Sequence, residues 1–185
     1  MSYKRRQNAM KRYFTYIDRE QDYLQKPWIV TYQGEEYFAF MNSHSAALTK
    51  EKCNDLDYLT DCEAFPRLQK LIDYSGIKKK VNLSEVFVKA KEQGYKLSKR
   101  ELSPDFDFLL YYDKSYYKLG LVHATYAIVD DGDLSIVYHQ GENISPLVIS
   151  NDIGLCIIMP MKYPSEQYIR ENGYIVINLI DLIDE

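Results

Sequence analysis

The chain has 185 residues, of which 46% are hydrophobic and 27% are charged, and its formal net charge at pH 7 is -4. This length and composition predict a globular protein of one ordinary domain or two small ones. The acidic balance argues against a protein that binds nucleic acid over its whole surface, but it leaves room for a local basic patch.

Residues 3 to 17 predict a helix, because Met10, Phe14 and Ile17 recur at spacings of four and three. Five basic side chains lie in the same segment, at Lys4, Arg5, Arg6, Lys11 and Arg12. Two interpretations stay open for them: a solvated charged face, which is the commoner case, or a face directed at DNA.

A polar connector at 18–26 precedes a predicted hairpin, whose strands at 28–32 and 37–41 flank a glycine turn. The hairpin ends in the turn-prone residues 42–45, which include His44 between two serines. A histidine beside serine suggests a nucleophile and its base, but no orienting carboxylate stands nearby in the sequence. A histidine in a surface turn is therefore the favoured interpretation, and no hydrolase is predicted.

The composition changes at residue 65. Residues 49–64 are acidic and irregular, whereas residues 65–72 bring back apolar side chains behind a proline. We predict a domain boundary here. The expected units are a first half at 1–64, with a helix and a hairpin, a second half at 65–163, and a C-terminal extension at 164–185.

A second helix is predicted at 82–93, where Asn82 can cap the N-terminus, Glu85 can reach back to it, and Gly94 ends the helix. This is the most basic part of the chain. Its candidate DNA-facing side chains are Lys78, Lys79, Lys80, Lys89 and Lys91.

A strand is predicted at 106–112, followed by a third helix that Ser115 caps and that runs to about residue 129. His123 lies near the apolar stripe of this helix, where a hydrogen-bonded interior histidine is more common than a ligand. A strand at 134–138 follows an acidic turn that lacks the ligand spacing of a calcium loop.

The clearest strand signal is a hairpin at 147–149 and 155–158, which stops at Pro160 because proline cannot donate to a strand ladder. Methionines stand on both sides of this proline. They form either an exposed apolar rim that binds a peptide or, as the commoner case, side chains that fill gaps in a buried hairpin. A last strand or an adhesive tail is predicted at 174–180.

The sequence shows no Gly-rich phosphate loop, metal-ligand spacing or internal repeat. Three cysteines, Cys53, Cys62 and Cys156, are odd in number and lack paired histidines, so they are predicted to be free thiols. Without a signal core or a membrane-spanning run, the chain is expected in the cytoplasm. We therefore predict no catalytic site, metal or cofactor, and no membrane association.

Four segments resemble parts of a known protein family. Residues 105–162 contain FDFLLYYDKSYYKLGLVHATYAIV and then GLCIIMPMK, and earlier parts of the chain contain EYFAFMNSHSAAL and FPRLQKLI. These segments resemble the last half-domain, the TDGHR-like turn and the FPDYRRV-like link of the bacterial sliding clamp, the β subunit of DNA polymerase III. The ending MPMK, similar to the family's MPMR-like sequence, is the most specific. The resemblance implies an abbreviated α+β, DNA-clamp-like fold with antiparallel sheets and two or three helices packed on one face.

In this family the turn, the link and the closing strand form a hydrophobic cleft that binds peptides of polymerases and other clamp clients. The resemblance assigns the cleft to His44, Pro66, Leu71, Ile158, Met159, Pro160, Met161 and Lys162. It also implies contact of the basic helices with double-stranded DNA and, if the module forms a ring, a homo-oligomer. The chain departs from the family at Asn42, Ser43 and Ser45, which replace aspartate, glycine and arginine, and at Lys162, which replaces arginine. It is also shorter than a three-domain clamp.

The predicted function is a non-enzymatic clamp-like module in DNA replication that contacts DNA, captures peptides, or does both. An alternative is an inhibitor or decoy of the same fold, from a phage or mobile element, that binds a partner protein without DNA. The 18 tyrosines suit such a contact surface, and they equally suit an aromatic core. A third hypothesis is an enzyme that uses His44 or a cysteine.

Overall fold

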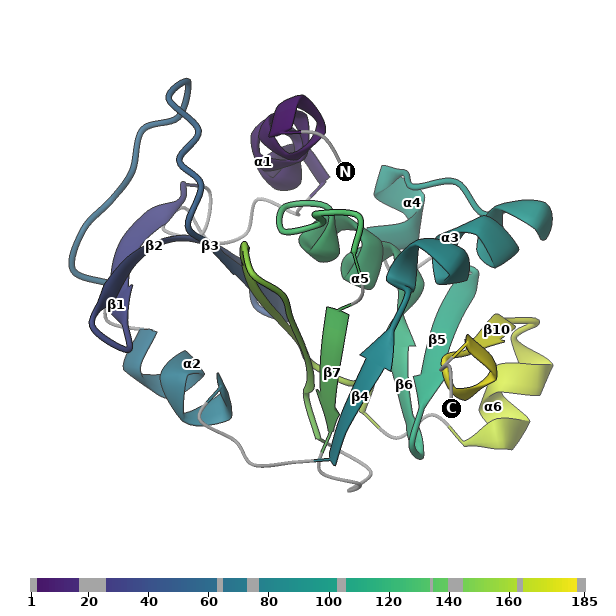
Figure 1. Cartoon of the computed structure of the whole chain (residues 1–185). Coiled ribbons are helices and arrows are strands. Elements are labelled where there is room, and N and C mark those ends of the chain that lie inside the picture. The colour runs from purple at the N-terminus through teal and green to yellow at the C-terminus, as the bar shows by residue number, and fades with distance from the viewer. Residues whose placement is uncertain are drawn as a thin grey trace.

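The computed structural model describes residues 3–16, 26–62, 65–72, 77–102, 106–133, 135–139, 145–162 and 165–182. Its largest element is a seven-stranded sheet in the order β1-β2-β3-β9-β8-β7-β4, in which all neighbours are antiparallel (Figure 1). The strands are β1 (Trp28–Tyr32), β2 (Glu35–Met41), β3 (Ser45–Thr49), β4 (Ile77–Val81), β7 (Ser135–His139), β8 (Leu147–Ser150) and β9 (Gly154–Ile158).

A second sheet has three strands in the order β10-β5-β6, with bounds β5 (Phe108–Tyr112), β6 (Ser115–Lys118) and β10 (Ile175–Asn178). The helices are α1 (Tyr3–Tyr16), α2 (Phe65–Ile72), α3 (Leu83–Glu92), α4 (Lys99–Leu102), α5 (Leu119–Tyr126) and α6 (Glu166–Glu171), and a short 3-10 helix lies at Ile180–Leu182. None of these helices is long and apolar enough to cross a membrane, within the described part of the chain. The helices and the two mostly antiparallel sheets make the fold α+β, which agrees with the expected fold class.

The large sheet is apolar on both faces, because alternate residues of a strand point to opposite sides. One face packs against α1, α3 and α5 and contributes Phe40, Ala47 and Cys156 to the main core. The opposite face has a second cluster that includes Ala46 and Phe65, the first residue of α2. Figure 1 accordingly shows α2 on the side of the sheet away from α1.

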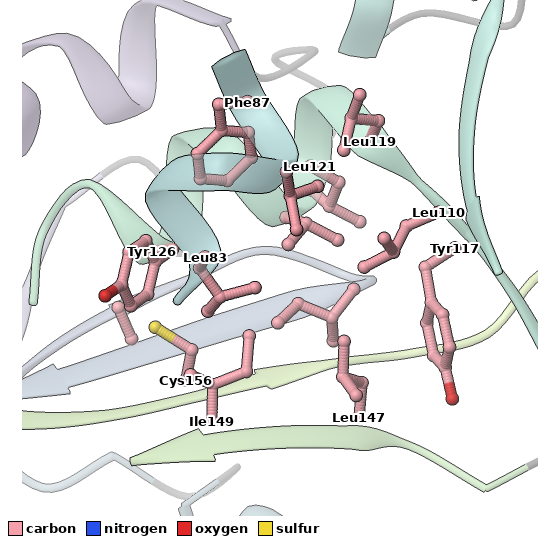
Figure 2. Close-up of a cluster of buried hydrophobic side chains, with 14 of the residues drawn as sticks. Leu83, Phe87, Leu110, Tyr117, Leu119, Leu121, Tyr126, Leu147, Ile149 and Cys156 are labelled. Atoms are coloured by element: carbon pink, nitrogen blue, oxygen red, sulfur yellow. The ribbon is translucent and has the colours of Figure 1, made fainter. Parts of the chain in front are cut away.

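The main core fills the space between the two sheets and the helices. Figure 2 shows side chains of α3 and α5, such as Phe87 and Tyr126, converging on Ile149 and Cys156 of the large sheet. Leu83 and Ile149 are fully buried. Because burial of such a side chain stabilises by about 1.5–3 kcal/mol, this cluster fixes both helices on the sheet.

Several predicted elements are confirmed. The N-terminal helix and the hairpin of β1 and β2 form where the sequence indicates them. Asn82 caps α3 by accepting a bond from the Ser84 N–H at 3.2 Å, and its Nδ2 donates to Glu85 Oε1 at 3.0 Å. Gly94 follows this helix with a φ of +92°, a conformation that favours glycine.

The prediction that Ser115 caps a helix is wrong. Ser115 begins β6, which pairs with β5, and α5 begins only at Leu119. The reason is a two-residue turn in which Asp113 and Lys114 have φ angles of 41° and 68°. Positive φ at both turn residues matches the twist of paired strands, so the chain returns as a hairpin before the helix starts.

The C-terminal residues belong to the second sheet. β10 pairs with β5 in parallel, with Ile175 opposite Phe108, so the expectation of purely antiparallel sheets is wrong at this one pair. The large sheet joins both predicted halves of the chain, because β3 pairs with β9. The boundary at residue 65 stays a prediction, and the predicted connector falls largely on residues 17–25, outside the described ranges.

Candidate functional site

The turn that contains His44 meets the end of the closing strand. Asn42 Oδ1 accepts bonds from the N–H groups of His44 at 2.7 Å and Ser45 at 2.8 Å, which holds the turn. β3 then pairs with β9, with Ser45 opposite Ile158, and the Met159 N–H donates to the His44 carbonyl at 2.8 Å. We call His44, Ile158 and Met159 the β3–β9 end. Two of the three predicted cleft segments thus lie side by side.

The β3–β9 end presents an apolar side chain to solvent. Met159 is 37% exposed, whereas its neighbour Ile158 is fully buried in the main core. His44 is exposed, and Pro160 is half-buried. Partial desolvation, and to a smaller extent the positive charge of Lys118, lowers the pKa of His44 below its ordinary value.

The third predicted segment, α2, packs on the same face of the sheet. Phe65 belongs to the cluster that contains Met41, Ala46 and Ile157. Ile157, two residues before Met159, therefore belongs to the same cluster as Phe65. Pro66 is exposed on α2, while the side chain of the predicted cleft residue Leu71 lies outside the described residues.

Met161 and Lys162 continue away from this face. The Met161 N–H donates to the Tyr116 carbonyl at 2.8 Å, at the edge of the second sheet. Its half-buried side chain packs against the cluster of Phe106, Leu109 and Ile169. Lys162 is exposed. The structure therefore separates Met161, which contacts the second sheet, from Met159 at the β3–β9 end.

A buried polar network lies directly behind the His44 turn, and sequence reasoning missed it. Thr125 Oγ1 of α5 donates to Ser45 Oγ at 2.9 Å, and Asn42 Nδ2 donates to the same oxygen at 3.0 Å. Tyr13 of α1 lies 3.2 Å from Ser45 Oγ and accepts a bond from Asn42 Nδ2 at 3.1 Å. Burial raises the pKa of the Tyr13 hydroxyl. The network thus fixes the turn to α1 and α5, which lie on the main-core face of the large sheet.

The predicted basic face of α1 is only partly exposed. Arg6 is buried, and it donates to Glu51 through Nε at 2.8 Å and to the Asp130 carbonyl at 3.2 Å. Lys11 forms an ion pair with Asp55 at the surface. The remaining basic side chains of α1 are exposed, namely Lys4, Arg5 and Arg12.

The second basic cluster is distributed over both faces of the sheet. Three exposed lysines, Lys78, Lys79 and Lys80, follow one another on the edge strand β4. Lys79 lies opposite Val137, a residue of the main core, so it points to the helix side. Lys78 points the other way, with its ammonium 5.3 Å from the ring centre of Tyr138. Two more exposed lysines, Lys89 and Lys91, lie in the last turn of α3.

A pocket of about 570 Å³ opens on the α2 face at the other end of β3 and β9. Three tyrosines, Tyr32, Tyr37 and Tyr138, and the ammonium of Lys50 form part of its wall. Lys50 is paired with Glu35 at 2.7 Å and lies 5.7 Å from the ring centre of Tyr37. The predicted cleft residues are not among those that line it.

His123 contacts a core side chain, and Cys156 belongs to the main core. His123 stacks on Phe87 with ring centres 4.1 Å apart, and its Nδ1 lies 3.0 Å from the Tyr95 hydroxyl. Desolvation and the charge of Lys91 lower the pKa of His123 to about 4. Cys156 is buried, which raises its pKa. In the described ranges, no three His, Cys, Asp or Glu side chains gather as a metal site.

Comparisons of the chain with protein-family models, with curated proteins and with solved structures find no match.

Proposed function

We propose that the chain is a non-enzymatic, sliding-clamp-like module of DNA replication in the cytoplasm, and that it captures short peptides at the β3–β9 end. The observation that carries the proposal is the bond between the Met159 N–H and the His44 carbonyl, 2.8 Å long. It joins the turn to the closing strand, and this contact supports the proposal because the resemblance expects both segments in one cleft. Exposed Met159 supplies an adaptable apolar contact for a peptide side chain.

The α2 helix supports the same proposal. Phe65 packs α2 on the face that carries Ala46 and Ile157. We propose that α2 and Met159 form the two walls that a peptide contacts. Pro66 is exposed near the start of this helix. A peptide that buries one aliphatic side chain between these walls gains about 1.5–3 kcal/mol from that contact.

The test is binding of a fluorescein-labelled peptide that contains the clamp-binding segment of a replicative polymerase, followed by anisotropy. Met159→Asp should weaken binding at least tenfold, because a carboxylate replaces the apolar contact. Tyr168→Asp is the matched control, since Tyr168 is 46% exposed on α6, and it should bind as the native chain does. Equal affinity of both variants, or a native chain that does not bind, would refute peptide capture at this end.

DNA contact is a second candidate function, favoured by the exposed cations on the helix side of the sheet. Lys4, Arg5 and Arg12 lie on α1, and Lys89 and Lys91 lie on α3, which are two of the helices on this side. Neutralisation of phosphates by such side chains makes affinity fall steeply with salt. A decoy that binds only protein lacks this dependence.

A short duplex separates the two candidates. DNA contact predicts retention at low salt, a loss of at least tenfold between about 50 and 200 mM salt, and weaker binding by Lys89→Gln with Lys91→Gln. Lys114→Gln, at the exposed turn between β5 and β6, should change nothing. If the duplex is not retained at low salt, the DNA function fails and peptide capture by a decoy stays as the alternative.

A further inference from the structure

The strand β10 has an open outer edge. The N–H groups of Ile175 and Leu179 donate to the carbonyls of Asp107 and Tyr111, both at 2.9 Å, beside β5. Because backbone groups alternate along a strand, the N–H groups of Val176 and Asn178 point away from β5. Among the described residues, no strand pairs with this outer side.

The other strand edges of the two sheets are covered or charged. The edge of β1 is covered at its start by Leu59, whose carbonyl accepts the Ile29 N–H at 2.8 Å. The outer edge of β6 receives the Met161 N–H. β4 carries its three exposed lysines, which is a common protection against edge-to-edge pairing. Within the described ranges, β10 has neither kind of protection.

β10 itself is mostly apolar and carries no charge, and the neighbouring carboxylate of Asp181 accepts a bond from Asn178 Nδ2 at 3.3 Å. Val176 is 38% exposed and Ile180 is 52% exposed. The segment 174–180, YIVINLI, contains no charged residue, proline or glycine. An uncharged edge strand rich in β-branched residues is a template for pairing with another strand.

We propose that β10 pairs with β10 of a second copy of this chain in a closed two-fold dimer. In such an interface both copies contribute the same surface, so the charges of this surface must not repel those of an identical one. β10 fulfils this condition because its residues are uncharged, whereas two β4 strands would place lysines opposite lysines. Val176 and Ile180 then lose their exposure to water. The dimer is independent of the proposed function, since it uses neither the β3–β9 end nor the basic helices.

The test is the mass of the native chain in solution, measured by sedimentation equilibrium in the presence of a thiol reductant, over a hundredfold range of concentration. The mass should rise from that of one chain, 21.8 kDa, to twice that value and then stop. Val176→Lys should remain monomeric over the same range, because it places like charges near one another at the two-fold axis. Ile180→Lys, at the more exposed position, is a second disruptive variant.

Tyr3→Lys is the matched control, because Tyr3 is 54% exposed but lies on α1. It should dimerise as the native chain does, and circular dichroism should show the same fold for every variant. A native chain that stays monomeric, a mass that rises beyond two chains, or dimers of both lysine variants as stable as the native dimer would overturn the proposal.

Discussion

Replacement of Ser45 by alanine tests the polar network that fixes the His44 turn. The Ser45 hydroxyl is the common partner of Thr125, Asn42 and Tyr13, at 2.9, 3.0 and 3.2 Å. Thr125 is fully buried, so its hydroxyl would lose its partner without gaining water. A buried polar group left unsatisfied costs about 1–3 kcal/mol. Asn42 is only half-buried and Tyr13 keeps its bond from Asn42, so we expect a total loss of about 2–3 kcal/mol.

Urea unfolding, followed by tyrosine fluorescence and circular dichroism, measures this loss. Ser43→Ala is the matched control in the same turn, because Ser43 is exposed, and it should change the free energy of unfolding by less than about 0.5 kcal/mol. Ser45→Ala combined with Thr125→Val should be less destabilised than the sum of the two single changes, because the second change removes the orphaned hydroxyl. Strict additivity, or a loss for Ser45→Ala as small as that of the control, would refute the network's role.

Three further changes test other contacts. Gly154→Ala should destabilise by about 3 kcal/mol in a thermal melt, because its new Cβ would lie 2.0 Å from the Leu48 carbonyl oxygen. Glu51→Gln should cost about 2 kcal/mol in urea unfolding, because the buried Arg6 loses its charged partner at 2.8 Å. His123 has a folded-state pKa of about 4, below the ordinary 6.5, so the unfolded chain takes up the proton first as the pH falls. The contribution of neutral His123 to the free energy of unfolding is complete above pH 6.5 and falls by about 3 kcal/mol by pH 4. Urea unfolding at several pH values should show that His123→Asn lacks this part of the acid sensitivity.

Elements with strong local signals could be predicted from the sequence. The capping pair of Asn82 and Glu85 and the glycine turn between β1 and β2 are local patterns, and both form. The hairpin at Ser115 could not be predicted in this way, because Asp113 and Lys114 adopt positive φ without a glycine to indicate it. The parallel pairing of β10 with β5 joins Ile175 to Phe108, and local periodicity contains no information about such a distant partner.

The candidate site shows the same division between local and distant information. The turn, the link and the strand end could be named from sequence segments, and the structure brings Met159 to His44. The network behind them joins residues 32 and 80 positions apart, and serine and threonine occur too widely to indicate such a bond. The burial of Arg6 could not be predicted, because helical spacing does not reveal that Glu51, 45 positions away, approaches it.

Two residues of the His44 turn, Asn42 and Ser45, have clear physical roles in this chain. The side-chain oxygen of Asn42 holds the turn by accepting the N–H groups of His44 and Ser45 at 2.7 and 2.8 Å. Ser45 is small and its hydroxyl lies inside, where an arginine would displace Thr125 and Tyr13. Serine at this position therefore attaches the turn rigidly to α1 and α5, through Tyr13 and Thr125. Peptide capture at this end should accordingly depend on apolar contact more than on charge, and the affinity for the labelled peptide should change little with salt.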